Sequence, residues 1–529
     1  MRGAYRSGAV WALTVACLAC GGAGSDSPAA DGEIDTPVAE VGAPDGGAAD
    51  DGPDAPDLEV DAEPEDVAEP APEIEPQPEI EPDDLPADPG PEVEAETGDA
   101  DATDGPSDAA STADEIDATT EEGCPDPTAD ETLRQALILS GQNVVEISIG
   151  LSQSNIAYLR THPYSYVAGT IALADASGLL GPFEVAIRLK GGGKGNDGGS
   201  FQDIDNKPSF KVDMNRLVPC QTLAGMSKMT LNNMVQDPSM LHEWVAYGLY
   251  RNRDLPAPRV GYAWVTVNGQ EYGLYANIEV YDQRAFRHEH FPSTAHLYEG
   301  QSGSDFSVSL AGGFEVDHGD PLDRSDLDAA IAALVAAPPE GLVATTNAHF
   351  HWPAVATFLA VENFVGQQDG YTQQRNNFYA HSDDDGRFTL LPWGHDTTLG
   401  TPLLFGYLKG NIAKRCLRDP DCHLLYEEAM AATVIEVSTG NLIQRVQDRA
   451  ATLEPWVVAD PRRPYTLAEH YAERDTLLLF LSEQPVRLMS SVACAADTTT
   501  DSDKDGYDCI HDCDDSLSSV YPGSVALCP

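Results

Sequence analysis

The sequence predicts a mixed α+β fold in which a strand-rich part precedes a helical part. Short apolar runs such as VVEISI at 144–149 alternate with turn residues, as is typical of strands. Later stretches such as 352–366 keep apolar residues at helical spacing over several turns. Two acidic residues, Asp369 and Asp396, stand where the two parts meet.

The strand-rich part is expected to pair its strands through tight turns. Asn268-Gly269, for example, is the signal of a type I′ hairpin turn. Its predicted strands cover 144–149, 166–173, 185–190, 259–267 and 270–280, and its predicted helices cover 152–160 and 239–251.

The second part is predicted to be helical apart from one hairpin. That hairpin runs from the adjacent amides Asn376-Asn377, through a turn at 383–386, to a strand at 388–393. The predicted helices cover 324–336, 352–366, 422–437, 441–454 and 467–491.

The first twenty residues predict bacterial export. Arg2 and Arg6 precede a short apolar core at 9–18, and the run ACGG follows at 19–22. An apolar core of about ten residues is half the length that spans a bilayer. ACGG resembles a lipoprotein cleavage site, so we expect a lipid anchor at Cys20, with an ordinary cleaved signal at 1–20 as the alternative.

Charge is distributed unevenly along the chain. The formal net charge is −57, and residues 25–123 contain many Asp and Glu but no Lys or Arg. Such a composition buries too little apolar surface to fold, so 21–123 are predicted to be a disordered spacer. We expect a globular domain at 124–495 and a small Cys- and Asp-rich module at 496–529. Because the sequence has no basic stripe, a nucleic-acid partner is not expected.

Cysteine usage also indicates export. Of the ten Cys, eight lie beyond the predicted signal, an even number that favours disulfides of unknown connectivity. Cys416 and Cys422 are close enough to close a local loop, and the spacing CLRDPDC fits no common zinc site.

The hairpin is predicted to bring together the groups that phosphoryl transfer needs. Asp369 precedes the amides, and Asp396 ends the returning strand. Such a reaction needs a carboxylate that orients the attacking hydroxyl and an amide and a carboxylate that hold Mg²⁺ on the phosphates. We therefore expect Asp369 to orient the attacking hydroxyl and Asn377 and Asp396 to bind Mg²⁺. The alternative is that these acids belong to a solvated hairpin without a catalytic role.

Four cations on two neighbouring predicted strands indicate an anion site in this acidic chain. They flank a glycine-rich loop at 191–195, whose backbone N–H groups are free to approach phosphate. Surface cations paired with nearby acids are the alternative. The four candidates are Arg188, Lys190, Lys207 and Lys211.

Several of these segments resemble the CotH (spore-coat protein H) kinase family. The hairpin matches the family's D-x(n)-NN strand and its PWG-x-D run, the cations lie in its R-x-KG and K-x-SFK pair, and GLYANIEV at 273–280 matches its GLY-x-x-x-E. The resemblance implies an atypical two-lobed protein-kinase-like fold, with a strand-rich N-lobe and a helical C-lobe. It also implies ATP as a cofactor and Ser/Thr of another exported protein as the substrate.

The resemblance further implies individual roles. Lys207 or Lys211, with Lys211 preferred, would contact phosphate, and Glu279 would lie near the adenine or the metal. The helix at 239–251 would stand where a kinase carries its αC helix, with Glu243 as a candidate partner for a lysine; a solvated helix face is the interpretation we favour for Glu243.

Two departures from the kinase pattern support a different class of function. A kinase catalytic loop places its Asn five residues after the Asp, whereas Asn377 lies eight after Asp369, and Gly394 replaces the first acid of the PWD-x-D form. The alternative is a catalytically inactive, kinase-like binding or adhesion protein. In either case we expect the protein at the bacterial cell envelope or surface, lipid-anchored or secreted.

The C-terminal tail has the order of a calcium loop. Asp501, Asp503 and Asp505 alternate along the chain, Gly506 allows a sharp turn, and Asp512 takes the twelfth place. The pattern resembles the small Cys-bearing calcium repeats of exported proteins, so we expect Ca²⁺ there, with an unstructured acidic tail as the alternative.

Overall fold

The computed structural model describes residues 121–192, 199–403, 408–512 and 515–519. The predicted signal and Cys20 lie outside these residues, as do nearly all of the predicted spacer at 21–123, part of the glycine-rich loop, and Cys513 and Cys528. Within the described part, no helix combines the length and the apolar character that crossing a membrane requires.

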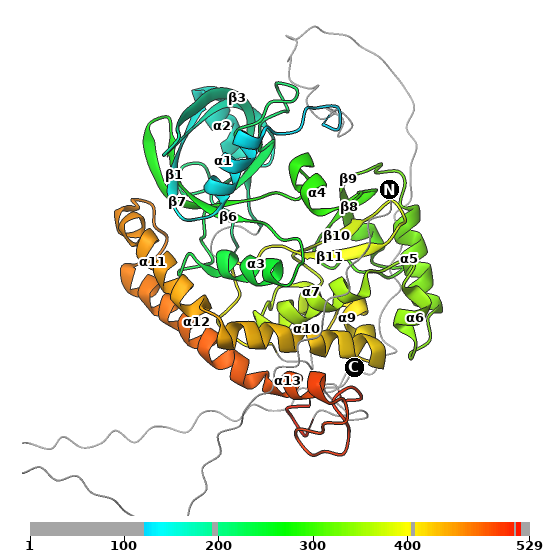
Figure 1. Cartoon of the computed structure of the whole chain (residues 1–529). Helices are drawn as coiled ribbons and strands as arrows, with labels where there is room; N and C mark the ends of the chain where they lie inside the picture. Colours follow the sequence, from blue (N-terminus) through cyan, green and yellow to red (C-terminus); the bar gives the residue numbers. More distant parts are fainter. Residues whose placement is uncertain (1–120, 193–198, 404–407, 513–514, 520–529) are drawn as a thin grey trace, which may run out of the picture. The chain divides into compact units, whose positions relative to one another are not determined.

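Seven strands of the first part close into a barrel, which the sequence did not predict (Figure 1). The order around the barrel is β1-β2-β3-β4-β5-β7-β6, and a parallel pairing of β1 with β6 closes it. The strands are β1 (Val144–Leu151), β2 (Val167–Asp175), β3 (Gly178–Lys190), β4 (Ser209–Asp213), β5 (Lys228–Asn232), β6 (Val260–Val267) and β7 (Gln270–Ile278).

The predicted hairpin is confirmed, and it belongs to a second sheet. β10 and β11 pair antiparallel around the turn at 383–386, with Phe378 opposite Pro392. Two strands that the sequence analysis missed complete the sheet, in the order β11-β10-β8-β9. The strands are β8 (His296–Gly300), β9 (Phe314–His318), β10 (Phe378–Ser382) and β11 (Phe388–Pro392).

Helices dominate the remainder, so the predicted mixed α+β class is confirmed, while a kinase-like two-lobed arrangement stays a prediction. The helices of the first 300 residues are α1 (Ala129–Leu139), α2 (Gln153–Thr161), α3 (His242–Asn252) and α4 (Arg284–His290). Those that follow are α5 (Ser325–Ala336), α6 (Leu342–Thr346), α7 (Trp352–Phe364), α8 (Tyr371–Gln374), α9 (Asn411–Cys416), α10 (Pro420–Thr439), α11 (Leu442–Ala459), α12 (Leu467–Arg487) and α13 (Met489–Ala496).

Helix α3 begins three residues later than predicted because Asp237 binds the backbone before it. The Oδ1 atom of Asp237 accepts the N–H of Met240 at 2.9 Å, and its Oδ2 atom accepts the N–H of His242 at 2.8 Å. A carboxylate in this place satisfies N–H groups that have no partner inside the helix.

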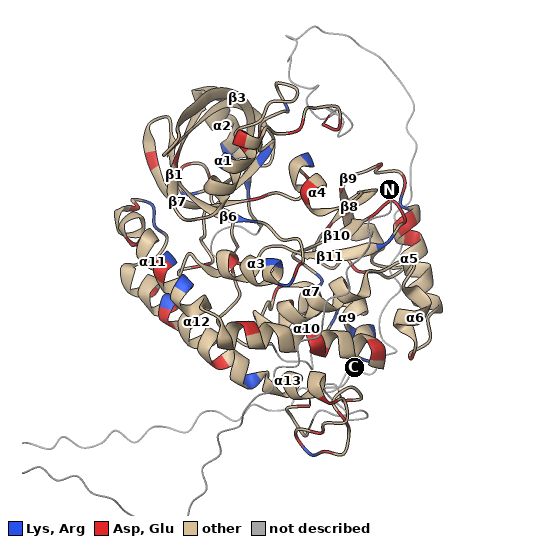
Figure 2. Cartoon of the chain, in the orientation of Figure 1, with Lys and Arg blue, Asp and Glu red and all other residues tan. Residues whose placement is uncertain are grey.

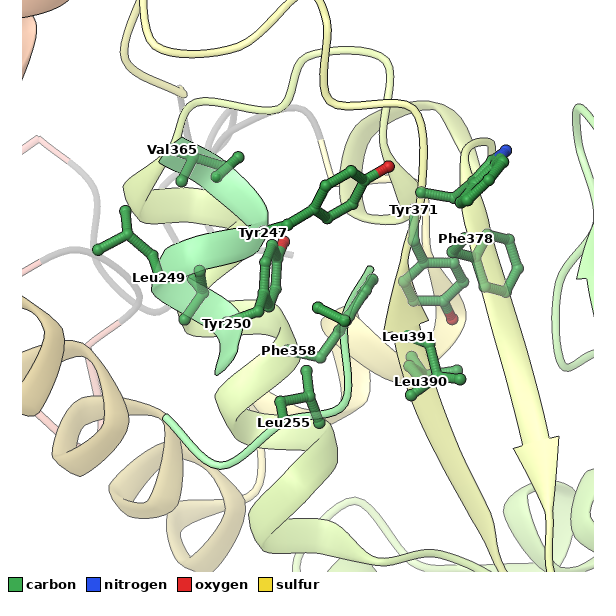
Figure 3. Packing of buried hydrophobic residues seen from close by; sticks show 14 of the residues in the cluster. Tyr247, Leu249, Tyr250, Leu255, Phe358, Val365, Tyr371, Phe378, Leu390 and Leu391 are labelled. Carbon is green, nitrogen blue, oxygen red and sulfur yellow. The ribbon is translucent and has the colours of Figure 1, made fainter. Parts of the chain in front are cut away.

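Two apolar cores hold these elements together. One fills the barrel, and the other joins α3 and α7 to the hairpin sheet. Figure 3 shows the second core, where Tyr250 of α3 faces Phe358 of α7 and the ring of Tyr371 lies beside that of Phe378 in β10. Buried aromatic rings each remove a large apolar area from water, so this core fixes α3 against the hairpin.

Three disulfides are present among the described cysteines. The predicted local loop between Cys416 and Cys422 is confirmed. Cys124 bonds to Cys220 across 96 residues, and Cys494 bonds to Cys509, which ties the C-terminal module to α13.

A buried ion pair connects the barrel to the end of α11. Lys207 Nζ lies 2.6 Å from Asp460 Oδ2, and the two side chains are 6% and 0% exposed. The same oxygen accepts the N–H of Leu274 in β7 at 2.9 Å. A Cβ atom on Gly273 would lie 1.9 Å from the Asp460 carboxylate, so this approach requires glycine.

Replacing Asp460 by Ala is expected to lower the free energy of unfolding by about 3–5 kcal/mol, because Lys207 would keep a buried charge without its partner. Urea unfolding monitored by circular dichroism measures the change. The matched control is Asp205→Ala, which breaks the exposed Arg160–Asp205 pair and should cost about 1 kcal/mol or less. Equal losses in the two variants would contradict this account of the barrel connection.

Candidate functional site

A cleft of about 610 Å³ lies between the barrel and the hairpin sheet. β3, β4 and β5 supply most of its cations, β8 and β9 supply acids, and Trp393 follows the end of β11. Figure 2 shows both signs of charge near the junction of barrel and sheet. The cleft is therefore polar and large enough for a small-molecule ligand, since such sites measure about 300–1,000 Å³.

Three of the four predicted cations line this cleft. β3 pairs with β4 so that Arg188 lies opposite Lys211, and Lys190 ends β3 two residues beyond Arg188. Lys228 of β5 also lines the cleft, although the sequence analysis missed it. Lys207 does not share this wall, because it is held by Asp460 in the buried ion pair.

Lys190 is the cation that approaches the predicted acidic residues. Its Nζ lies 5.4 Å from the centre of the Trp393 ring, and Glu243 and Asp396 are its main opposite charges. Burial lowers the pKa of Lys190, while these two carboxylates act against that shift. Lys211, which the sequence analysis preferred as the phosphate-binding lysine, instead interacts electrostatically with Asp282 and Asp317.

Glu243 lies inside the structure, so the solvated position that we favoured for it is wrong. The residue is 5% exposed, and its carboxylate accepts hydrogen bonds from Asn232 Nδ2 at 2.8 Å and from the Tyr247 hydroxyl at 3.3 Å. Burial, together with the nearby Asp396, raises the pKa of Glu243 to about 8, against the influence of Lys190. The apolar residues around it on α3 suggested an amphipathic helix, whereas that helix is buried on nearly every face.

Asp396 follows the end of β11 and faces the same lysine. Burial raises the pKa of its carboxyl, the charge of Lys190 lowers it, and Asp237 raises it further. Its carbonyl oxygen lies 2.9 Å from Nδ1 of His242, the first residue of α3. The hairpin and α3 therefore meet at Asp396.

The second predicted acid, Asp369, is held by the predicted amide. Asn377 Nδ2 donates to both the carbonyl oxygen and Oδ2 of Asp369, each at 3.0 Å. A Cβ atom on Gly394 would lie 2.7 Å from Asn377 Oδ1, and Gly394 has a φ of 59°. The glycine in the PWG-x-D run therefore leaves room for Asn377, and the eight-residue spacing still brings the amide back to the acid.

A buried carboxylate that the sequence analysis missed holds the loop after Asp369. Glu362 on α7 accepts the N–H of Tyr371 at 2.7 Å and the N–H of Thr372 at 2.9 Å. A Cβ atom on Gly370 would lie 2.2 Å from its Oε1 atom. The only sequence signal for this role is a charged residue within an otherwise apolar helix.

Glu279 is engaged elsewhere. The residue is 2% exposed, and its Oε2 atom accepts hydrogen bonds from Nε of Arg259 at 2.9 Å and from the backbone N–H of Arg259 at 3.0 Å. This two-point contact connects the end of β7 to the start of β6, so Glu279 has a structural role at this position.

Asn377 and Lys190 line the cleft, whereas Asp369 and Asp396 are not among its lining residues; the chemistry of Asn377, Asp396 and Lys190 is nevertheless of the kind that Mg²⁺ and nucleotide phosphates need. Since Nδ2 of Asn377 points at Asp369, its Oδ1 atom is the free acceptor, and Asp396 supplies a carboxylate. Hard oxygen donors are the ligands that Mg²⁺ prefers. Lys190 supplies the cation that phosphate oxygens require.

A second oxygen-rich cluster lies in the C-terminal module. Two overlapping groups of carboxylates lie with ligand atoms within 4.8 Å of one another: Asp501 with Asp503 and Asp515, and Asp503 with Asp505 and Asp512. Four of these are the predicted residues, and Asp515, which follows them, was missed.

The orientation of these carboxylates fits a cation. In Asp503, Asp505 and Asp515, the Oδ1 atom accepts a backbone N–H, while the Oδ2 atom is buried without a hydrogen-bond donor. Burial and the neighbouring acids raise the pKa of Asp503 and of Asp515. Carboxylate oxygens that converge in this way are the ligands that Ca²⁺ takes.

Replacing Glu362 by Gln is expected to remove a pH dependence of stability. Burial raises the pKa of Glu362 from 4.5 to about 7, so the stability that its proton contributes is complete below pH 4.5 and lost as the pH rises through 7. The wild-type advantage over Glu362→Gln in free energy of unfolding should fall by about 2–3 kcal/mol between pH 5 and 8.

Urea unfolding at several pH values measures this difference. The matched control is Glu340→Gln, at an exposed position, which should follow the wild type at every pH. A constant difference between wild type and Glu362→Gln would contradict the buried, proton-binding role.

Comparison with known proteins assigns most of the part of the chain that forms the cleft to a protein family. The family model described as CotH kinase protein matches residues 187–484, more than half of the chain and the stretch from β3 into α12. Inner spore coat protein H of Bacillus subtilis is 20% identical over 284 residues, which cover 50% of this chain and 78% of that protein. Spore coat protein homolog 1 of Rhizopus delemar is 23% identical over 268 residues, which cover 45% of this chain and 42% of that protein. Both relatives are named as spore coat proteins, and the chain belongs to the CotH kinase protein family.

Proposed function

We propose that this protein is an exported kinase that transfers the γ-phosphoryl group of ATP to a Ser or Thr hydroxyl of another exported protein. The observation that carries the proposal is that Lys190 lines a polar cleft and interacts electrostatically with Glu243 of α3 and with Asp396, which follows the hairpin. In protein kinases a strand lysine paired with a helix glutamate contacts the phosphates. Family membership supports the same activity.

In this proposal the cations of the barrel bind the phosphates. Lys190 contacts phosphate oxygens and has Glu243 as its main opposite charge, while Arg188 and Lys211 add positive charge along the same wall. Asn377 and Asp396 would hold Mg²⁺, which neutralises charge on the phosphates when it is bound.

Asp369 orients the attacking hydroxyl and takes its proton. The hydroxyl oxygen forms a bond to the γ-phosphorus, the bond from that phosphorus to the bridging oxygen breaks, and ADP leaves. The hydrogen bonds from Asn377 fix Asp369 for this role. Because Asp369 is exposed, a protein substrate has access to it.

A non-catalytic binding protein is the second candidate, and one contact favours it. Asn377 Nδ2 occupies Oδ2 of Asp369, one of the two carboxylate oxygens that could take the proton. In that case the cleft would bind nucleotide without transfer.

We further propose that the protein resides at the cell envelope, with a lipid anchor at Cys20 and Ca²⁺ in the C-terminal module. The anchor rests on the ACGG run, and the envelope location is supported by relatives that are named as spore coat proteins. The Ca²⁺ ligands would be Asp501, Asp503, Asp505 and Asp512, joined by Asp515.

Replacing Asp396 by Asn is expected to weaken binding of Mg²⁺–ATP at least tenfold, because the site would lose a carboxylate ligand. Calorimetric titration of the full chain measures this affinity. The matched control is Asp384→Asn, in the exposed turn of the same hairpin, which should bind as the wild type does. Wild-type protein that binds no Mg²⁺–ATP would refute both the kinase and the nucleotide-binding candidate.

Measuring phosphoryl transfer distinguishes the kinase from the non-catalytic binding protein. For a kinase, Asp369→Asn should retain Mg²⁺–ATP affinity within a few-fold and lose radiolabel transfer from [γ-³²P]ATP by about 10²-fold or more. Equal labelling by the variant would exclude the role of Asp369. Nucleotide binding by the wild type without any labelling would favour the binding protein.

Removal of Ca²⁺ is expected to destabilise the C-terminal module. A ligand that binds the folded state at about 100 times its Kd contributes about 2.7 kcal/mol, so calorimetry should detect binding and chelator should lower the melting temperature of the module. Asp503→Asn, which affects both carboxylate groups, should abolish this response. The matched control Asp508→Asn should preserve it, since Asp508 contacts His511 instead. A melting curve unchanged by chelator would refute the Ca²⁺ site.

A further inference from the structure

A second cavity, of about 460 Å³, lies between α3 and α11. Four arginines line it: Arg251 in α3, Arg259 before β6, and Arg445 and Arg449 in α11. Figure 2 shows basic segments on both helices. The whole chain has 30 Lys and Arg against 87 Asp and Glu, so a cavity lined by four cations and a single acid is against the trend of this sequence.

Three of these arginines have no carboxylate partner among the described residues. Glu279 and Glu289 form ion pairs with Arg259, and Glu279 acts on Arg251 only from a longer distance. Asp448 also lines the cavity, but its Oδ1 atom accepts a hydrogen bond from Gln444 at 2.8 Å, and it pairs with none of the arginines. The cavity therefore keeps an excess of positive charge.

Trp244 and backbone carbonyls hold the guanidinium groups in place. Arg445 and Arg449 lie one helical turn apart over the Trp244 ring, at 5.7 and 4.9 Å from its centre. Arg449 Nη2 donates to the carbonyl oxygen of Ser140 at 3.4 Å, and its Nε is buried without a hydrogen-bond acceptor. Arg251 donates to the carbonyl oxygen of Pro258.

The arginines of this cavity repel one another, which favours the binding of an anion between them. Burial lowers the pKa of Arg251 to about 10, against Glu279, and Arg259 and Arg445 lower it further. Burial also lowers the pKa of Arg449, with a contribution from Arg445. An anion among these groups would replace repulsion by attraction in a partly desolvated place.

We propose that this cavity binds a small phosphorylated molecule through Arg445, Arg449 and Arg251. Planar guanidinium groups match the oxygens of phosphate with two parallel hydrogen bonds, and the buried Nε of Arg449 is a donor that such an oxygen would satisfy. The volume falls in the range of small-molecule sites, about 300–1,000 Å³, so the ligand is larger than a lone phosphate. The site is separate from the cleft of the proposed function and does not depend on kinase activity.

Calorimetric titration of the full chain with inorganic phosphate at constant ionic strength tests the proposal. The wild type should bind, and Arg445→Ala with Arg449→Ala should weaken binding at least tenfold. Since Arg445 is exposed, Arg445→Ala alone keeps the fold and should weaken binding several-fold. Arg487→Ala, on an exposed face of α12, is the matched control and should bind as the wild type does.

Two further arms identify the place and the chemistry. Lys190→Ala removes any phosphate that binds in the other cleft, so the binding that this variant keeps should be the part that Arg445→Ala with Arg449→Ala weakens. Acetate should bind more weakly than phosphate at equal concentration. The proposal is overturned if the wild type binds no phosphate, if the double variant binds as tightly as the wild type, if only Lys190→Ala loses binding, or if acetate binds equally well.

Discussion

The structure around the cleft depends on one electrostatic constraint: several ammonium and carboxylate groups are partly buried close to one another. An isolated ammonium or carboxylate there would be costly, so each charge needs its opposite nearby. Glu243 and Asp396 are the main opposite charges that act on Lys190, and Asn232 and Tyr247 hold Glu243 through hydrogen bonds. This requirement brings the end of a barrel strand, helix α3 and the end of the hairpin together. The same requirement explains why Glu243 belongs to a helix that is buried on nearly every face.

The loop that carries Asp369 is built by contacts to backbone rather than by regular secondary structure. Glu362 accepts the two N–H groups that follow the loop, and Asn377 reaches back to Asp369 from the start of β10. Gly370 and Gly394 allow these approaches, since a Cβ atom at either position would collide with the polar group beside it. Asp369 is therefore exposed and yet held in a fixed position. A residue that acts on a second protein needs both properties.

Helix α3 connects two separate places where cations collect in this acidic chain. On one side Glu243 faces Lys190 in the cleft, and on the other Trp244 packs beneath Arg445 and Arg449 of α11. The core in Figure 3 fixes the same helix against α7 and the hairpin. Helix α3 therefore lines the arginine cavity directly, while it acts on the cleft only through the charge of Glu243 near Lys190.

The sequence by itself determined the mixed α+β class, the hairpin around 383–386, the local disulfide at Cys416–Cys422 and the family, because each depends on periodicity, turn residues or spacing within a short stretch. Closure of the barrel depends on β1 meeting β6 across more than a hundred residues, which no local pattern encodes. Side-chain partners also depend on contacts between distant segments. The sequence shows that Lys207 is a cation, but it does not show that Lys207 pairs with Asp460, 253 residues away. Lys190 rather than Lys211 faces Glu243 for this reason too, since only packing of distant elements decides which of several like charges meets an acid.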